Sequence, residues 1–240
     1  MQHSLLVLMT YVSLLIGHFV LLTSPVRSQQ NKMIHQDGPD KTHAEHSKLY
    51  KQYSGRGDLR KLAEKTSGDI EVVNELPQKM FQSDAPPVQL GTILRDLTNS
   101  SDAVLIGIVK DRASFVTEEG TFVFTDYDLA VEQILKNNPV NLLHPSDKVS
   151  VTRPGGDLQL NGHSVRALDR SLAPLLVGGR YLLFLDYIPD TGAYKAFNSH
   201  GSFRIQGNRT AKLTMEQLPS DLEGGADIEV LAAFIRAAVR

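Results

Sequence analysis

Asp126 and Asp128 are the residues that most resemble a pair of catalytic carboxylates or a site for a hard cation. Both alternate with apolar side chains, because Tyr127 lies between them and Leu129 follows. Successive side chains of a strand point to opposite faces, so this alternation directs both acids away from the apolar face. We therefore interpret the pair as the solvated face of a strand.

Histidine occurs close to serine at two places, in Gly162-His163-Ser164 and in His200-Gly201-Ser202. Adjacent residues of a strand point to opposite faces, so His163 and Ser164 do not pair as a base and a nucleophile. The sequence also has no nucleophile elbow, no His-Glu-x-x-His motif, no dinucleotide fingerprint and no Walker loop. We therefore expect a protein that is not an enzyme. The alternative is an exported hydrolase whose site is assembled from distant positions.

Four residues are candidates for binding a ligand. Arg153 precedes the Pro154-Gly155-Gly156 corner, which we interpret as a strand-ending turn because a phosphate loop would continue into a helix. His163 falls on the apolar face at the rim of a hairpin. It is either a half-buried structural histidine or a residue that contacts a ligand. The other two are Arg180, at the mouth of a strand, and His200, in a loop.

No metal or cofactor is expected. The chain has no cysteine, which removes thiolate ligands and cysteine nucleophiles. His35, His43 and His46 lie in a polar segment that lacks the ordered surroundings needed to hold metal ligands, so we interpret them as solvated.

The overall composition is that of a globular protein of ordinary size. The chain has 240 residues, 41% of them hydrophobic and 22% charged, with a formal net charge of -2. A nucleic-acid-binding protein usually has a basic balance, so nucleic acid is not an expected partner. The expected partner is therefore an unknown protein or small ligand.

The N-terminus carries an apolar run, Ser4–Thr23, followed by Val26-Arg27-Ser28. This pattern predicts a signal peptide over residues 1–28, with an uncleaved membrane anchor as the alternative. Either way the rest of the chain faces an exported compartment, and a membrane is contacted only if the run stays uncleaved. Residues 29–87 are polar and poor in aromatics, so we expect a largely disordered tail ending at Pro86-Pro87.

The remaining residues, 88–240, predict a mainly β domain. The buried strands expected are Ala103–Val109 and the apolar run Tyr181–Leu185, with a long strand at Thr121–Leu135. Asn161-Gly162 marks a two-residue hairpin that sets Asp157 opposite Arg166.

Helices are expected at both ends of this domain. Leu90, Ile93, Leu94 and Leu97 have the spacing of an amphipathic helix. Asp227 is a suitable N-cap for a second helix, Ile228–Val239, which we expect to pack across the sheet or close one end of a barrel.

The order of these segments resembles a known family. A helix is followed by Ser-Asp-Ala-Val-Leu-Ile-Gly-Ile-Val, by a strand ending Val131-Glu132-Gln133-Ile134-Leu135-Lys136, and by Val-Gly-Gly-Arg-Tyr-Leu-Leu-Phe-Leu. This pattern, over Leu90–Phe197, resembles uncharacterised bacterial secreted proteins with an OB-like barrel similar to netrin-like and metalloproteinase-inhibitor domains. The resemblance implies an OB-like antiparallel β-barrel with flanking N- and C-terminal helices. The inhibitors' N-terminal cysteine and disulfides are missing, so their mechanism does not transfer.

The expected function is therefore an exported, non-enzymatic binding or protein-interaction module. The alternatives are the exported hydrolase and a membrane-tethered accessory protein held by an uncleaved Ser4–Thr23.

Overall fold

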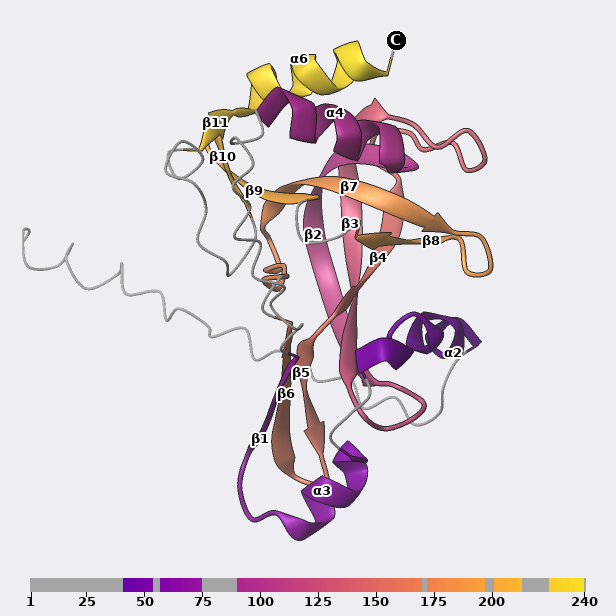
Figure 1. The fold of residues 1–240 in the computed structure, drawn as a ribbon, viewed down its shortest axis with the longest axis vertical. Helices are drawn as coiled ribbons and strands as arrows, with labels where there is room; N and C mark the ends of the chain where they lie inside the picture. Colours follow the sequence, from indigo (N-terminus) through magenta and orange to yellow (C-terminus); the bar gives the residue numbers. More distant parts are fainter. Residues whose placement is uncertain are drawn as a thin grey trace, which may run out of the picture. The chain divides into compact units, whose positions relative to one another are not determined.

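The computed structural model describes residues 41–53, 57–74, 90–169, 172–196, 201–212 and 225–239, which all belong to one unit, residues 35–240. Strands predominate, as predicted (Figure 1). The helical elements are α2 (Lys41–Lys48), η1 (Lys51–Tyr53), α3 (Leu59–Lys65), α4 (Leu90–Ser100) and α6 (Ile228–Ala238). The strands are β1 (Ile70–Asn74), β2 (Ala103–Val116), β3 (Val123–Lys136), β4 (Lys148–Pro154), β5 (Gly156–Leu160), β6 (His163–Asp169), β7 (Arg180–Ile188), β8 (Ala193–Ala196), β9 (Ser202–Gln206), β10 (Arg209–Lys212) and β11 (Ala226–Asp227).

Five consecutive pairings close a ring of strands. β2 pairs antiparallel with β3, β3 with β4, and β7 with both β2 and β8. β4 and β8 pair in parallel and complete the ring. β9, β10 and β11 extend the same sheet outward from β7. β7 is therefore shared between the ring and this extension.

The predicted central run Tyr181–Leu185 is buried on both faces. Tyr181, Leu183 and Leu185 join the cluster inside the ring, together with Leu129 and Tyr194. Alternation places the two residues between them, Leu182 and Phe184, in a second cluster outside the ring. This confirms the prediction of a strand covered on both sides.

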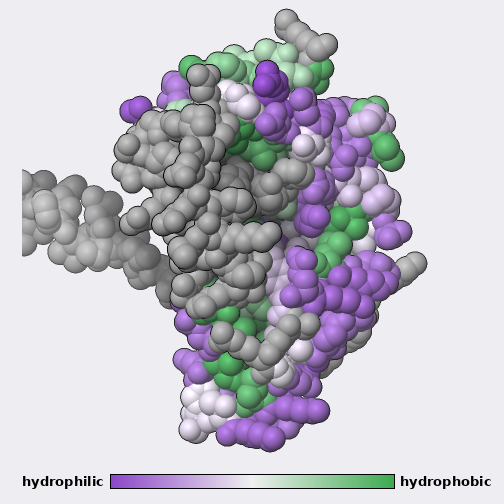
Figure 2. Space-filling view, in the orientation of Figure 1, coloured by the Kyte–Doolittle hydropathy of each residue, from purple (hydrophilic) through white to green (hydrophobic). Residues whose placement is uncertain are grey.

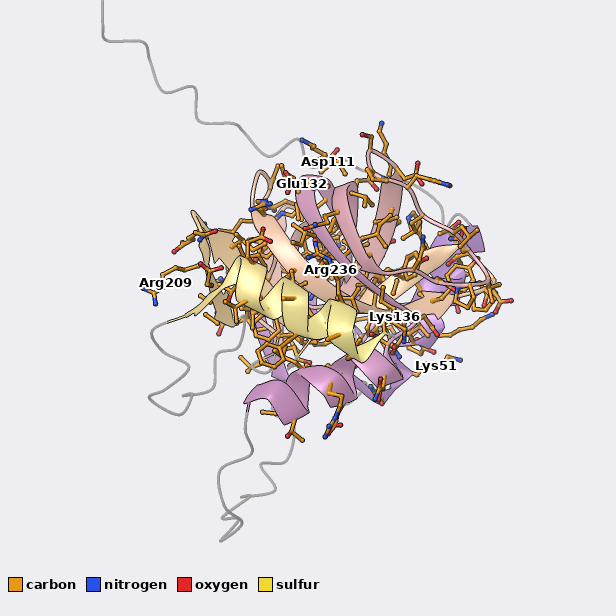
Figure 3. The ribbon with its side chains drawn as sticks, turned by 90° about the horizontal axis from the view of Figure 1, so that it is seen from above. Lys51, Asp111, Glu132, Lys136, Arg209 and Arg236 are labelled. Atoms are coloured by element: carbon orange, nitrogen blue, oxygen red, sulfur yellow. The ribbon has the colours of Figure 1, made fainter. Side chains whose placement is uncertain are left out.

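Helices α4 and α6 cover that second cluster and lie side by side in Figure 3. The predicted stripe of α4 is buried at Leu94 and Leu97. Asp227 caps α6 as predicted, because its Oδ1 accepts from the amides of Glu229 at 2.8 Å and Val230 at 3.4 Å. The C-terminal helix therefore packs across the sheet, one of the two positions expected.

The hairpin predicted at Asn161-Gly162 joins β5 to β6. Both turn residues have positive φ, 51° and 83°, as a two-residue turn of this kind requires. The predicted register holds, with Asp157 opposite Arg166 and their side chains 3.3 Å apart. β1 pairs in parallel with β6 to form a separate sheet.

Residues 41–53 and 57–74 depart from the disordered tail expected for residues 29–87. They form α2, η1, α3 and β1, and His46, Tyr50 and Leu59 are buried. Asp58 begins α3 as an N-cap, accepting from the Arg60 amide. A short helix was possible from the sequence at Leu59–Thr66, but it was expected to bury little, whereas Leu59 and Ala63 are buried. Residues 41–53 escaped prediction because their buried side chains, His46, Ser47 and Tyr50, are polar or aromatic.

Within the described ranges no helix is both long and apolar enough to cross a membrane, and the run Ser4–Thr23 lies outside those ranges. The signal-peptide interpretation of residues 1–28 and the boundary at Pro86-Pro87 also fall outside them.

Candidate functional site

The most elaborate polar contact in the described part of the chain joins α2 and η1 to the outside of the ring. We call residues 41–53 the strap. The surface beneath it is the outer face of β3 and β4 with the loops 117–122 and 189–192, which we call the docking face. In Figure 1, α2 lies beside the lower part of the hairpin that β2 and β3 form.

His46 is the centre of this contact and is fully buried. Its Nδ1 lies 3.0 Å from both carboxylate oxygens of Asp126, and its Nε2 lies 3.0 Å from Thr191 Oγ1. An ionised carboxylate only accepts, so Nδ1 is the donor to Asp126; in the neutral ring Nε2 then accepts from the Thr191 hydroxyl. One ring thus links the strap to β3 and to the loop between β7 and β8.

Asp126 was interpreted above as part of a solvated strand face, and that interpretation is wrong for this residue. Its side chain is 13% exposed because the strap covers it, whereas Asp128, two residues further, remains exposed. The alternation correctly directed both acids outward. It carried no information about a helix eighty residues earlier in the chain.

The order Asp126–His46–Thr191 is that of a carboxylate, a base and a hydroxyl nucleophile. Catalysis of acyl transfer would also need donors for the developing oxyanion. The turn does not supply them, because the amides of Thr191 and Gly192 both donate to the carbonyl of Ile188. The buried His46 ring is moreover shielded from solvent. The arrangement therefore suits a structural anchor better than a catalytic site.

Aromatic contacts surround this polar centre. Tyr50 stacks on Phe124 with ring centroids 5.5 Å apart, and its hydroxyl donates to Thr152 Oγ1 at 3.2 Å. Tyr53 stacks on Phe122 at 4.7 Å. Burial raises the pKa of the Tyr50 hydroxyl well above its usual value. The site therefore holds Tyr50 as a neutral phenol.

Polar contacts continue at the edge of the strap. Ser47 Oγ accepts from the amide of Glu118 at 2.7 Å, and Lys51 lies 3.5 Å from the carboxylate of Glu119. A hydrogen bond to Glu45, helped by Glu118 and Asp190, raises the pKa of Lys48. The docking face thus has an acidic rim, formed by Glu118, Glu119 and Asp190, facing a basic helix.

Arg153, a predicted binding residue, lies inside the ring instead of at its surface. Its side chain is 1% exposed, and neither Nη1 nor Nη2 has a hydrogen-bond partner among the described residues. Burial lowers its pKa, opposed by the electrostatic effect of nearby tyrosines, Tyr127 first. A ligand bound to the Pro154-Gly155-Gly156 corner from outside would therefore not reach the guanidinium.

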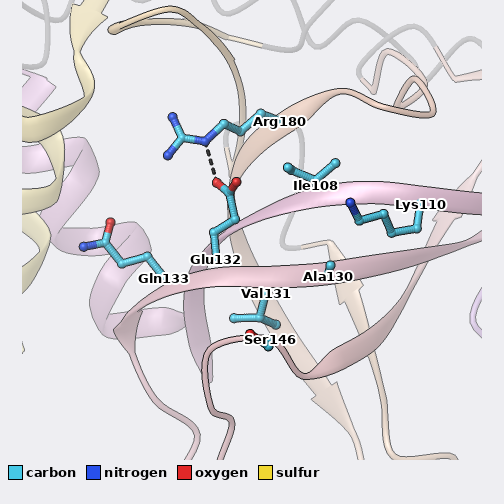
Figure 4. A pocket seen from close by; sticks show the side chains of 8 residues that line it. All are labelled: Ile108, Lys110, Ala130, Val131, Glu132, Gln133, Ser146 and Arg180. Atoms are coloured by element: carbon cyan, nitrogen blue, oxygen red, sulfur yellow. Dashed lines mark hydrogen bonds and ion pairs between the residues drawn. The ribbon is translucent and has the colours of Figure 1, made fainter.

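Arg180 pairs with Glu132, whose carboxylate lies 2.5 Å from Nε. Figure 4 shows the pair in a shallow pocket that also exposes Lys110. His163 is half-buried at the end of β6, opposite Leu160, while His200 lies outside the described residues. No contact joins Arg153, His163 and Arg180, so the described structure does not bring these predicted residues into one site.

An exposed apolar side of α6, with Val230 and Phe234, is seen at the top of Figure 2. Among the described residues, no group of three or more His, Asp or Glu side chains could hold a metal ion. His46, one of the histidines weighed above as a metal ligand, is instead held by Asp126.

The site that sequence reasoning missed is therefore His46, Asp126 and Thr191. A helical spacing of His43, His46, Ser47 and Tyr50 was the available signal, because these residues recur at intervals of three and four. Comparison with protein-family models and with curated proteins found no match to this chain.

Proposed function

We propose that the protein is an exported, non-enzymatic module that binds a polypeptide partner on the docking face, and that its ring is an OB-like barrel. OB-fold barrels bind their ligands on the face of the second and third strands and with the loops joining strands one to two and four to five. In chain order the ring strands are β2, β3, β4, β7 and β8. The corresponding face and loops are then β3, β4, 117–122 and 189–192, which together are the docking face.

The observation that carries this proposal is that the docking face already holds a polypeptide segment. His46 and Tyr50 of the strap are buried there, and both meet side chains of β3 or β4. A surface that buries a histidine and a tyrosine with paired hydrogen bonds has the composition of a protein interface. Export rests on the signal-like run Ser4–Thr23.

Site-specific photo-crosslinking tests the proposal. A photoreactive residue at Asp128, exposed on β3 beside the docking face, is expected to capture a discrete partner in the cells that produce the protein. The same residue at Arg236, exposed on α6, is the matched control. Equal labelling from both positions, or from neither, would contradict a binding role for the docking face.

An exported hydrolase is the second candidate, and one observation favours it: the order Asp126–His46–Thr191. In such an enzyme Thr191 Oγ1 would attack an acyl carbon while His46 took its proton and Asp126 oriented the ring. Turnover of p-nitrophenyl acetate that is lost in Thr191→Val and kept in Thr191→Ser would support it. Identical rates in both variants would assign the three residues a structural role.

A further inference from the structure

We propose that the strap is an intramolecular ligand of the docking face, which a basic, amphipathic, aromatic-containing helix of a partner protein displaces. The inference rests on the proposed function and adds the partner's chemistry and its regulation. Three properties of the strap lead to it: how it is attached, how it is charged and how little it contributes to the cores.

The strap contacts the face through one helical stripe. His43 lies against Phe115 of β2, at the edge of the docking face, with ring centroids 3.7 Å apart, and His46 meets Asp126 and Thr191. Ser47 binds the loop 117–122, and Tyr50 stacks on Phe124. Contacts at intervals of three and four residues are how an amphipathic helix lies in a groove of another protein. The strap therefore docks as a helical ligand would.

The ring does not need the strap for its own packing. The cluster inside the ring and the cluster beneath α4 and α6 contain no strap residue among those described. Tyr53, at the end of the strap, packs only against the edge of a third apolar cluster, which includes Leu59, Phe122 and Val165. The strap can accordingly leave in a local opening while the ring stays folded, a behaviour common in segments with few core contacts.

The strap alone is too short to keep its helical form. α2 has 8 residues, and isolated helices shorter than about 12–15 residues are marginal in water. The face therefore provides much of what orders the helix, and a released strap leaves the face open to another helix.

Charge defines the partner. The strap carries Lys48 and Lys51 next to Glu118, Glu119 and Asp190, with Asp126 beneath it. An empty face would present these acids around Phe115 and Phe124. The complementary ligand is a helix with basic residues at its edges, and with a hydrogen-bond donor and an aromatic ring four residues apart on one side. Such complementarity favours a basic partner over an acidic one.

Tethering makes the strap a strong competitor. A short linker holds a segment at an effective concentration in the millimolar range. A helix in solution therefore binds the intact protein weakly, and binds at least about tenfold better once the strap is weakened.

The test uses a fluorescent peptide with the sequence of residues 41–53 and measures anisotropy on titration with the full chain. His46→Ala/Tyr50→Ala in the protein is expected to tighten peptide binding at least tenfold. Gln52→Ala, which changes an exposed strap residue that takes no part in the proposed contacts, is the matched control and should bind as wild type. Adding Asp126→Ala to the first variant should weaken peptide binding at least tenfold. A peptide in which both His46 and Tyr50 are replaced by alanine should likewise bind at least tenfold more weakly.

Hydrogen exchange tests whether the strap opens independently of the ring. Amides of the strap are expected to exchange before those of β2 and β3 in the wild type, and faster still in His46→Ala/Tyr50→Ala, with the ring unchanged. Strap amides that exchange only together with the ring would overturn the inference, as would a released strap without tighter peptide binding. A wild-type dimer in light scattering would identify a second copy as the occupant and overturn the choice of partner.

The two proposals fail separately. Crosslinking from Asp128 without peptide binding would support the docking face as an interaction surface and would contradict the proposal that the strap is displaceable. Peptide binding without any crosslinked partner would support the strap as an intramolecular ligand and would contradict the proposed function of binding a partner protein.

Discussion

Replacing Lys136 by methionine tests a contact that fixes the end of α4 on the ring. Lys136 Nζ donates to the carbonyl oxygens of Thr98 at 2.7 Å and Ser101 at 2.5 Å, and lies 3.4 Å from that of Asn99. The last carbonyls of a helix have no partner within the helix, and a cation there also meets the negative end of the helix dipole. The ammonium therefore satisfies groups that would otherwise be unpaired at a partly buried site.

The two shorter hydrogen bonds set the magnitude. A hydrogen bond to a charged group contributes about 1.5–3 kcal/mol, and ordering a lysine side chain costs about 2 kcal/mol. A loss of about 1–4 kcal/mol in the free energy of unfolding is thus expected for Lys136→Met. For a unit of this size each kcal/mol lowers the Tm by about 2–4 °C, so the Tm should fall by about 2–16 °C.

Urea unfolding followed by circular dichroism measures the change. Lys148→Met, an exposed lysine of β4, is the matched control and should change stability by less than about 0.5 kcal/mol. Lys136→Arg keeps the charge and should recover part of the loss. If Lys136→Met matched the Lys148 control, the three carbonyls would have to be satisfied by water and the reasoning would be refuted.

Three further outcomes follow from the structure. Arg153→Met should leave stability unchanged or raise it by up to about 4 kcal/mol in urea unfolding, because it removes a buried guanidinium whose terminal nitrogens have no hydrogen-bond partner among the described residues. A loss above about 3 kcal/mol would instead show that nearby groups such as Asp169 more than offset the burial of the charge. Gly156→Ala should cost about 3 kcal/mol or more, since its Cβ would overlap the hydroxyls of Thr125 and Ser114, whereas Gly162→Ala, with positive φ in open space, should cost about 1 kcal/mol. The pKa of buried Tyr50 is raised, so its contribution to the free energy of unfolding is present below a pH of about 10. Above that pH the unfolded chain ionises, and the contribution is lost by up to about 1.4 kcal/mol per pH unit. Tyr50→Phe should reduce this slope in unfolding measured between pH of about 8 and 11, and an unaltered slope would contradict the prediction.

Features decided by neighbours in the sequence were predicted well. Asn161-Gly162 fixed the turn, and the turn fixed the register that brings Asp157 to Arg166. The helix beginning at Asp227 was equally local, because a capping side chain and an apolar stripe are both visible within a few residues. The run Tyr181–Leu185 revealed its burial on both faces because no polar residue interrupts it.

Contacts between distant segments were not predictable in the same way. Lys136 follows a strand pattern, and nothing near it in the sequence indicates that its ammonium ends a helix formed by residues 90–100. Arg153 was placed at a turn by its following proline and glycines. Its side chain nevertheless follows the alternation of β4 to the same inner side as Val149 and Val151, which are buried in the ring.

The strap shows why polarity alone misleads. Alternation along β3 correctly assigned Asp126 to the outer face of the strand, but a residue that points away from the core is solvated only if nothing else covers that face. His46 covers this face and hydrogen-bonds to the carboxylate of Asp126. The pair is thereby largely removed from solvent, although no aliphatic residue in the strap pattern indicates a buried position. A polar tail with histidines and tyrosines at helical spacing is therefore compatible with a docked helix. The same chemistry, with its modest apolar content and paired charges, is why we propose that the strap is a replaceable ligand and not a fixed part of the core.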